Sequence, residues 1–336
     1  MTTARDRRGR LLLLLAVALL AAVVVMSLMV GARAVAPWVV VEAFLRPDPD
    51  SADHVVILTQ RVPRTVIGIL AGAALALAGT LMQGLTRNPL ADPGLLGINA
   101  GASVAVLGAI TIWGITAPSG FVWFAFAGAA IAAVVVALIG TRGPDGSSPA
   151  KLALTGAAVT AGLTAVTTLI LTTSITAFDV FRYWQVGGLT VRGLDTVAVV
   201  AIPILVGAVI AFTSARGLDL MALGDDTATG LGHSVARTRT LGIVATVLLC
   251  GGATSIAGPI VFVGLLVPHA LRALVGGDYR WLLAIGAPAG AIVLVTADVI
   301  GRVIAPPGEV QAGLVVAFVG APVLISLVLR PGRVAL

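Results

Sequence analysis

Residues 5–30 read RDRRGRLLLLLAVALLAAVVVMSLMV, and this stretch decides the class of fold. Four arginines at its start are followed by an apolar run from residue 11 to residue 30. A helix needs about 20 apolar residues to cross the hydrocarbon of a bilayer. The apolar part of a secretory signal has only about 7–15, followed by a small-residue cleavage site. We therefore predict a retained first membrane helix that begins in the cytoplasm.

The composition of the whole chain supports the membrane class. Hydrophobic residues make up 58% of the 336 residues and charged residues 11%, whereas soluble domains carry about 25% charged residues. The net charge of +6 comes almost entirely from arginine, since Lys151 is the only lysine. Because the arginines lie at the ends of apolar segments, membrane topology explains them better than nucleic-acid binding. The single cysteine, Cys250, excludes an intrachain disulfide.

Ten apolar segments follow one another along the chain and predict an all-α polytopic membrane protein with about ten transmembrane helices. Only Gly258 and Pro259 separate the seventh segment from the eighth, so nine spans are an alternative. Ten spans with both termini in the cytoplasm place fourteen of the 21 basic side chains inside, as the positive-inside rule expects. The ten segments are roughly 11–36, 63–84, 94–113, 121–140, 151–173, 195–214, 239–257, 260–275, 281–301 and 310–329.

Glycine pairs within the segments predict close helix packing. Gly68 and Gly72 form one G-x-x-x-G pattern, and Gly97 and Gly101 form another. In lipid, small residues at this spacing let two helix backbones approach closely. The pattern favours a compact bundle and carries no information about the substrate.

Several kinds of chemistry are missing from the sequence. It contains no G-x-x-x-x-G-K-[ST] phosphate loop and no metal-ligand spacing of His, Cys or carboxylate, so we predict no catalytic site, no metal site and no ATP hydrolysis by this chain. Asp298 is the only acidic residue well inside a segment, and Arg302 follows one turn later. This spacing predicts an i,i+4 ion pair near the outer end of the segment rather than a proton relay.

The longest predicted cytoplasmic loop, residues 215–238, has a short apolar pattern broken by glycines. Asp225 and Asp226 suit the N-terminus of a short helix. A semi-apolar helical hairpin that faces water predicts a docking site for a partner protein, and a helix lying on the membrane surface is the alternative.

Two outer stretches leave alternatives open. Arg61 and Arg64 flank Pro63 at the start of the second segment, where they either reach lipid phosphates or bind an acidic soluble partner. Residues 174–194 contain several aromatic residues followed by Gly187 and Gly188. This composition fits either an interfacial belt or a short helix with a flexible break at a gate.

Several long motifs in a fixed order resemble the FecCD/BtuC-like permeases of binding-protein-dependent ABC importers, which carry iron–siderophores, haem or cobalamin. The resemblance covers about residues 55–330. The motifs are RVPR at 61–64, GTLMQG at 79–84, RNPLADPGLLG at 87–97, MALG at 221–224, TGLG at 229–232, AGPIVFVGLLVPHALR at 257–272, ADVIGR at 297–302 and GAP at 320–322.

The resemblance implies a type II ABC importer permease fold that forms one transmembrane domain over residues 1–336. Its implied partners are a second permease subunit (identical or homologous), two ATP-binding subunits that use ATP and Mg²⁺, and a periplasmic or lipid-anchored binding protein. The chain itself would bind no cofactor and act as no enzyme. It would lie in the cytoplasmic (inner) membrane of a bacterium.

Family positions carry over to individual residues of this sequence. Coupling helices at about 217–235 imply ATPase contact through Leu223, Gly224, Asp225, Thr227, Leu231 and Gly232. The family's docking arginines match Arg61, Arg64 and Arg302. The cytoplasmic gate matches Asn88 and Leu90, and a looser match places a constriction at Ser174 and Ile175, in the outer gate segment 174–194.

The resemblance implies a ferric siderophore as substrate, with haem and cobalamin as alternatives. A transporter driven by an ion gradient is the competing class, and a membrane scaffold is a third reading. The scarcity of ionisable residues inside the segments argues against the ion-coupled carrier.

Overall fold

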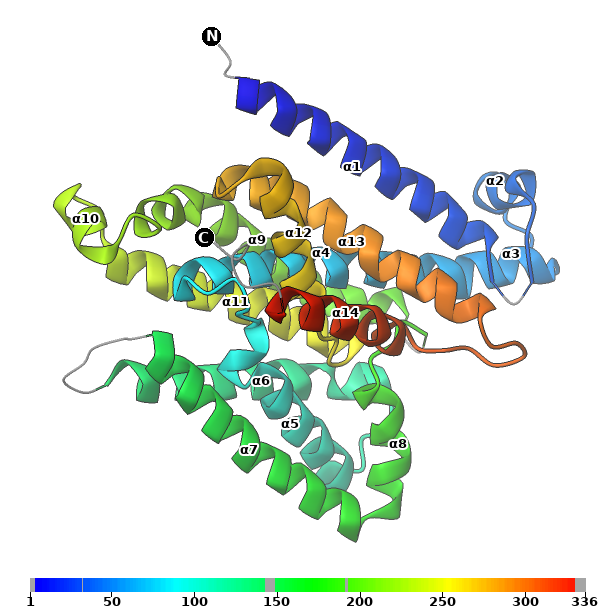
Figure 1. Cartoon of the computed structure of the whole chain (residues 1–336). Coiled ribbons are helices and arrows are strands. Elements are labelled where there is room, and N and C mark those ends of the chain that lie inside the picture. Colours follow the sequence, from blue (N-terminus) through cyan, green and yellow to red (C-terminus); the bar gives the residue numbers. More distant parts are fainter. Residues whose placement is uncertain (1–3, 32, 143–148, 191–192, 330–336) are drawn as a thin grey trace.

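The computed structural model describes residues 4–31, 33–142, 149–190 and 193–329. Within these ranges the chain consists of helices and their connections, without β-strands (Figure 1). Seven of the described helices are long and apolar enough to cross a membrane, and α5, α12 and α14 are shorter apolar helices. Each of the ten predicted segments overlaps one of these ten helices. The elements are α1 (Ala4–Met29), α2 (Pro37–Leu45), α3 (Ala52–Val56), η1 (Ile57–Arg61), α4 (Val62–Thr86), η2 (Pro93–Leu96), α5 (Ile98–Trp113), α6 (Pro118–Thr141), α7 (Pro149–Thr173), α8 (Ile175–Gln185), α9 (Leu194–Met221), α10 (Asp225–Gly230), α11 (Val235–Ala257), α12 (Val263–Val275), α13 (Tyr279–Val303) and α14 (Ala312–Val328).

Some predicted boundaries were wrong at the outer end of the first two segments. α1 ends at Met29, and the short helix α2 begins at Pro37, where proline suits the first helical turn. The helices α3, η1 and α4 form one continuous helical rod over Ala52–Thr86. The prediction began this helix at residue 63 because the polar residues before Pro63 interrupt the apolar pattern.

The seventh and eighth predicted segments form two separate helices, α11 and α12. α11 ends at Ala257, and Phe262 takes a left-handed backbone conformation with φ of 70° just before α12. α12 has 13 residues, which give a length of about 20 Å at 1.5 Å per residue. It is therefore too short to cross the hydrocarbon layer of about 30 Å by itself.

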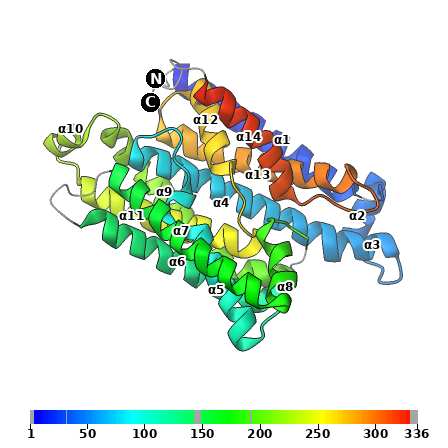
Figure 2. The ribbon, with the colours of Figure 1, turned by 60° about the horizontal axis from the view of Figure 1, so that its bottom comes forward.

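Helix α4 lies at the centre of the bundle and packs against α9, α11, α12 and α13. Twenty of its 25 residues are buried. Around it, α1 lies on α13, while α5, α6 and α7 form a second group on the other side of α11 (Figures 1 and 2). The central helix thus connects the two ends of the molecule through a rigid, buried rod.

The two ends of the bundle carry different elements. Figures 1 and 2 both place the start of α1 and helix α10 at one end and α2 and α3 at the opposite end. Helix α1 begins with several arginines, which the positive-inside rule places in the cytoplasm. Because α10 lies at the same end as the start of α1, this end is the cytoplasmic one.

The predicted glycine packing occurs where α4 crosses α13. A Cβ atom added at Gly72 would lie 2.4 Å from the carbonyl oxygen of Gly290, and one added at Gly290 would lie 2.2 Å from that of Gly72. The same reciprocal approach joins Gly101 of α5 to Gly128 of α6, at 2.3 Å in each direction. At Gly97, by contrast, the nearest atom would be 3.6 Å away, so only one member of that predicted pair is needed for packing.

Replacing Gly72 with alanine is expected to destabilise the protein by about 1–3 kcal/mol, because the added methyl group meets backbone that cannot rotate away. Gly108→Ala is the matched control, since a Cβ there has no neighbour within 4 Å. Denaturant titration of both variants in mixed micelles checks the prediction. Equal stability of the two variants would contradict the close approach of α4 and α13.

Candidate functional sites at the two membrane surfaces

The cytoplasmic connection between α9 and α11 forms a bent segment that we name the elbow, residues 222–234. Gly224 has φ of 110° and Gly232 has φ of 77°, and the six-residue helix α10 lies between them. Ser234 then caps α11 by accepting a hydrogen bond from the backbone N–H of Arg237 at 3.3 Å. The predicted coupling segment began at residue 217, whereas the structure continues α9 to Met221 and leaves one short helix in the elbow.

The elbow exposes apolar side chains on both sides of α10. Leu223 is 62% exposed and Leu231 is 63% exposed, while Ala228 between them is buried. Thr227 is also exposed. Two exposed leucines on a segment that faces the cytoplasm form an apolar patch that a partner protein can cover.

Asp225 points back into this chain and joins three elements. Its carboxylate binds Arg87, which follows the end of α4, and Arg239 of α11, where the N–O distance is 2.6 Å. The neighbouring Asp226 is exposed. The structure therefore gives Asp225 an internal role that its place in the predicted ATPase contact did not indicate.

The predicted gate residues Asn88 and Leu90 follow directly after Arg87. Arg87 takes a left-handed conformation with φ of 49°, which ends α4. The side-chain oxygen of Asn88 accepts a hydrogen bond from the backbone N–H of Leu90 at 2.9 Å, and both residues are exposed. The Arg87–Asp225 ion pair thus connects the elbow to the turn that carries both gate residues.

Ser174 and Ile175, the second predicted constriction, begin helix α8. The Ser174 hydroxyl caps this helix by accepting a hydrogen bond from the Ala177 N–H at 3.2 Å, and Ile175 is 83% exposed. Further along α8, the rings of Phe181 and Trp184 pack with centroids 5.6 Å apart. Residues 191 and 192 of the predicted outer gate segment 174–194 lie outside the described residues.

The Gly187–Gly188 break after α8 is packed against two other connections. Gly188 donates a backbone hydrogen bond to Ala257 at 2.8 Å, and Gly187 accepts one from Gly313 at 3.0 Å. These bonds tie the end of α8 to the end of α11 and to the start of α14. A hinge at this position would therefore move three segments together.

The outer end of the bundle contains a buried ion network. Asp298 of α13 binds Arg64 of α4, with N–O distances of 2.7 and 2.9 Å, and also binds Arg302. Arg64 reaches a second carboxylate, Glu309, at 2.7 Å. Arg302 donates to the carbonyl oxygen of Ser27 in α1 at 2.7 Å. The predicted i,i+4 pair of Asp298 and Arg302 is confirmed, and it forms the centre of this network.

Arg61 holds the end of α1 in the same region. It donates hydrogen bonds to the carbonyl oxygens of Leu28, at 2.7 Å, and of Arg33. The exposed fractions of Arg61, Arg64 and Arg302 are 5%, 8% and 2%. In this conformation their guanidinium groups are occupied by acceptors of the same chain and do not project from the outer surface.

Because Arg64 is buried in the ion network, reversing its charge would test the stability of that network as well as docking. From the sequence, Arg64→Glu should weaken docking of an acidic partner. In the structure, the new carboxylate would lie beside Asp298 and Glu309, so the variant would also disrupt the network. The exposed Arg33, whose side chain is 74% exposed, can be replaced without this complication.

Sequence reasoning missed several members of these sites. Arg87, Arg239, Glu309, Ser27 and Thr65 all bind predicted residues or each other, and Ser27 and Thr65 share a hydrogen bond of 2.8 Å. Ser27 could have been noticed, because it is the only hydroxyl group within the apolar run 11–30. The other four give no local signal.

Comparison with known proteins matches nearly the whole chain to one family. The model described as FecCD transport family matches residues 18–330. The ferric enterobactin transport system permease protein FepD of Escherichia coli is 47% identical over 323 residues, which are 96% of this chain and 94% of that protein. The cobalamin import system permease protein BtuC of Halobacterium salinarum is 38% identical over 280 residues, 83% of this chain and 74% of that protein.

A solved structure shares the architecture. A metal-chelate type ABC transporter in an inward-facing conformation superposes with a TM-score of 0.82 and 26% sequence identity, and the match covers 94% of this chain and 98% of that chain. The order of the helices and the fold of the bundle are therefore those of an importer permease.

Proposed function

Because this chain belongs to the FecCD transport family, we propose that it is the membrane-spanning permease subunit of an importer that moves a ferric siderophore across the inner membrane. As a member of this family the chain is a transport component and not itself a catalyst. The observation that carries the proposal is the elbow, which exposes Leu223 and Leu231 on the cytoplasmic side and is ion-paired through Asp225 to the end of α4.

The elbow is the proposed contact with an ATP-binding subunit. The contact residues are Leu223, Gly224, Asp225, Thr227, Leu231 and Gly232. The partner would bury the exposed side chains of Leu223 and Leu231. It would also hydrolyse ATP with Mg²⁺, for which this sequence has no phosphate-binding loop. A movement of the elbow would reach Asn88 and Leu90 through Arg87, because Arg87 lies next to the first of them and is bound to Asp225. This connection supports a cytoplasmic gate that responds to the ATPase.

Helix α7 is the proposed wall of the substrate path and the contact with a second permease subunit. Only 11% of its most apolar window is buried within this chain. One exposed face carries small and hydroxyl side chains at helical spacing, namely Ala157, Ala161, Thr164, Thr168 and Thr172. Such a face suits a helix interface or an aqueous path better than lipid tails. Ser174 and Ile175, which follow α7 and begin α8, are the proposed outer constriction.

The outer end is the proposed docking surface for a binding protein. A cavity of about 210 Å³ is lined there by Arg33, Gln60, Arg61, Arg64 and Glu309, among others. Glu309 is the partly exposed partner of Arg64. An acidic side chain of a binding protein would take its place, while Arg302 would stay bound to Asp298. In this proposal Arg64 becomes available for docking when Glu309 is displaced, whereas Arg302 keeps its structural role.

The substrate class follows from the relatives. A ferric siderophore is the first choice, since the 47% identical protein is a ferric enterobactin permease by name. Haem and cobalamin are the alternatives, and the cobalamin permease is 38% identical.

Uptake of radiolabelled substrates tests this proposal, with an iron label in the ferric chelates and in haem and a cobalt label in cobalamin. The full chain is reconstituted in proteoliposomes with its ATPase and binding-protein partners and supplied with a ferric catecholate siderophore, ferric citrate, haem or cobalamin. We expect uptake of the ferric catecholate that requires enclosed ATP and persists when an uncoupler removes the ion gradient. Uptake without ATP that the uncoupler abolishes would show an ion-coupled carrier and contradict the proposal.

A further inference from the structure

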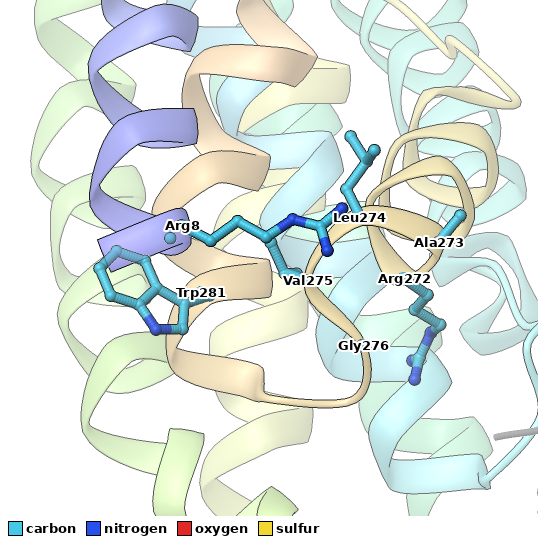
Figure 3. A pocket seen from close by; sticks show the side chains of 8 residues that line it. Arg8, Arg272, Ala273, Leu274, Val275, Gly276 and Trp281 are labelled. Atoms are coloured by element: carbon cyan, nitrogen blue, oxygen red, sulfur yellow. The ribbon is translucent and has the colours of Figure 1, made fainter. Parts of the chain in front are cut away.

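A basic cavity lies at the cytoplasmic end of the molecule, away from the elbow. Arg8 and Gly9 of α1, Arg272 and Leu274 of α12 and Trp281 of α13 line it, and its volume is about 460 Å³. This volume falls within the range of about 300–1,000 Å³ that is common for small-molecule sites. Figure 3 shows Arg8 reaching from α1 toward Leu274 in the last turn of α12, with Trp281 beside the start of α1.

The wall of the cavity at α1 is fixed by close packing. A Cβ atom added at Gly9 would lie 2.4 Å from two ring atoms of Trp281, so the indole ring packs directly on the backbone of α1. This contact holds the basic start of α1 against α13. Arg8 is therefore presented from a packed helix rather than from a free terminal segment.

The two arginines that line the cavity have no carboxylate partner in the part of the chain that the structure describes. Arg272 makes two long contacts of 3.4 Å to neutral groups, the side-chain oxygen of Gln83 and the hydroxyl of Tyr279. Its Nε atom is buried and has no hydrogen-bond partner among the described residues. By contrast, the cytoplasmic Arg280 is bound to Asp278 at 3.1 Å. The cavity is thus lined by two arginines whose charges no carboxylate of the described residues neutralises.

The position of the cavity matches the headgroup layer of the inner leaflet. Arg8 lies less than one turn before the apolar run that starts at Leu11, and Leu11, Leu14 and Leu15 of α1 are more than half exposed, as side chains that face lipid tails are. Trp281 is of the residue type enriched at membrane interfaces. Basic cavities between transmembrane helices on the cytoplasmic side suit the headgroups of anionic lipids.

We propose that this cavity binds a phosphate-bearing anion through Arg8 and Arg272, with Trp281 as its apolar wall. The two possible sources of that chemistry are the headgroup of an anionic phospholipid and free phosphate. The site is separate from the elbow and from the outer ion network, and it does not depend on which substrate the permease carries.

Native mass spectrometry of the full chain tests the proposal with phosphatidylglycerol, phosphatidylcholine and inorganic phosphate as probes. We expect one tightly retained phosphatidylglycerol, no retained phosphatidylcholine, and affinity about fivefold lower in each of Arg8→Gln and Arg272→Gln. Retention of inorganic phosphate with the same dependence on both arginines would identify free phosphate as the source.

Arg7→Gln is the matched control, because Arg7 is exposed on the same helix turn and does not line the cavity. It should leave lipid retention unchanged, and all three variants should unfold at the wild-type temperature in phosphatidylcholine. The proposal is overturned if Arg7→Gln lowers retention as much as Arg8→Gln, which would indicate unspecific surface charge. It is equally overturned if the wild-type chain retains neither phosphatidylglycerol nor inorganic phosphate.

Discussion

Replacing Asp298 with alanine is expected to lower the free energy of unfolding by about 3–5 kcal/mol, the typical cost of removing one partner of a buried ion pair. The Asp298 side chain is 1% exposed and binds both Arg64 and Arg302. Without it, two buried guanidinium groups lose their shared counterion, and only Arg64 keeps a carboxylate, Glu309. Denaturant titration of the purified chain in mixed micelles measures the effect.

Asp179→Ala is the matched control for this variant. Asp179 pairs with Arg182 at 3.2 Å on the same helical face, but both side chains are about half exposed. An exposed pair of this kind contributes about 0–1 kcal/mol. If the two variants lost equal stability, the outer network would be solvated rather than buried, and its role in joining α1, α4 and α13 would be wrong.

The helices and one ion pair could be predicted from the sequence because their signals are local. Apolar segments with few charged residues identify the ten helices, and a four-residue spacing identifies the Asp298–Arg302 pair. The first helix shows the limit of this reasoning. Its cytoplasmic start was recognised from the charge pattern, but its end at Met29 was not, because the apolar residues 34–36 continue the pattern without belonging to the helix.

The roles of the predicted arginines could not be derived, because their partners are distant in sequence. Arg64 and Asp298 are separated by 234 positions, and Arg87 and Asp225 by 138. No periodicity within one helix specifies which other helix lies beside it. Arginine near the end of a segment is compatible with lipid contact, with a partner protein and with a buried network, and only the packing of α1 and α13 against α4 selects the last.

Replacing Asp225 with arginine is expected to reduce ATP-driven uptake by about tenfold or more, in the range of typical coupling free energies between sites. In the structure the Asp225 carboxylate binds the guanidinium groups of Arg87 and Arg239. In the variant, three guanidinium groups would lie together without this carboxylate. Repulsion would move the elbow away from the end of α4. Uptake and ATPase stimulation by the loaded binding protein should therefore both fall, while stability changes little because the site is partly exposed.

Two further variants separate the internal bridge from the contact with the ATPase. Asp226→Arg adds the same charge to the neighbouring, exposed position, so it should have a much smaller effect if the bridge is what matters. The double variant Arg87→Asp with Asp225→Arg restores an ion pair between positions 87 and 225, while Arg239 loses its carboxylate, so it should recover part of the uptake. If Asp226→Arg were as damaging as Asp225→Arg and the double variant recovered nothing, the elbow would act through its surface charge alone. The connection from the elbow through Arg87 to the gate residues Asn88 and Leu90 would then be wrong.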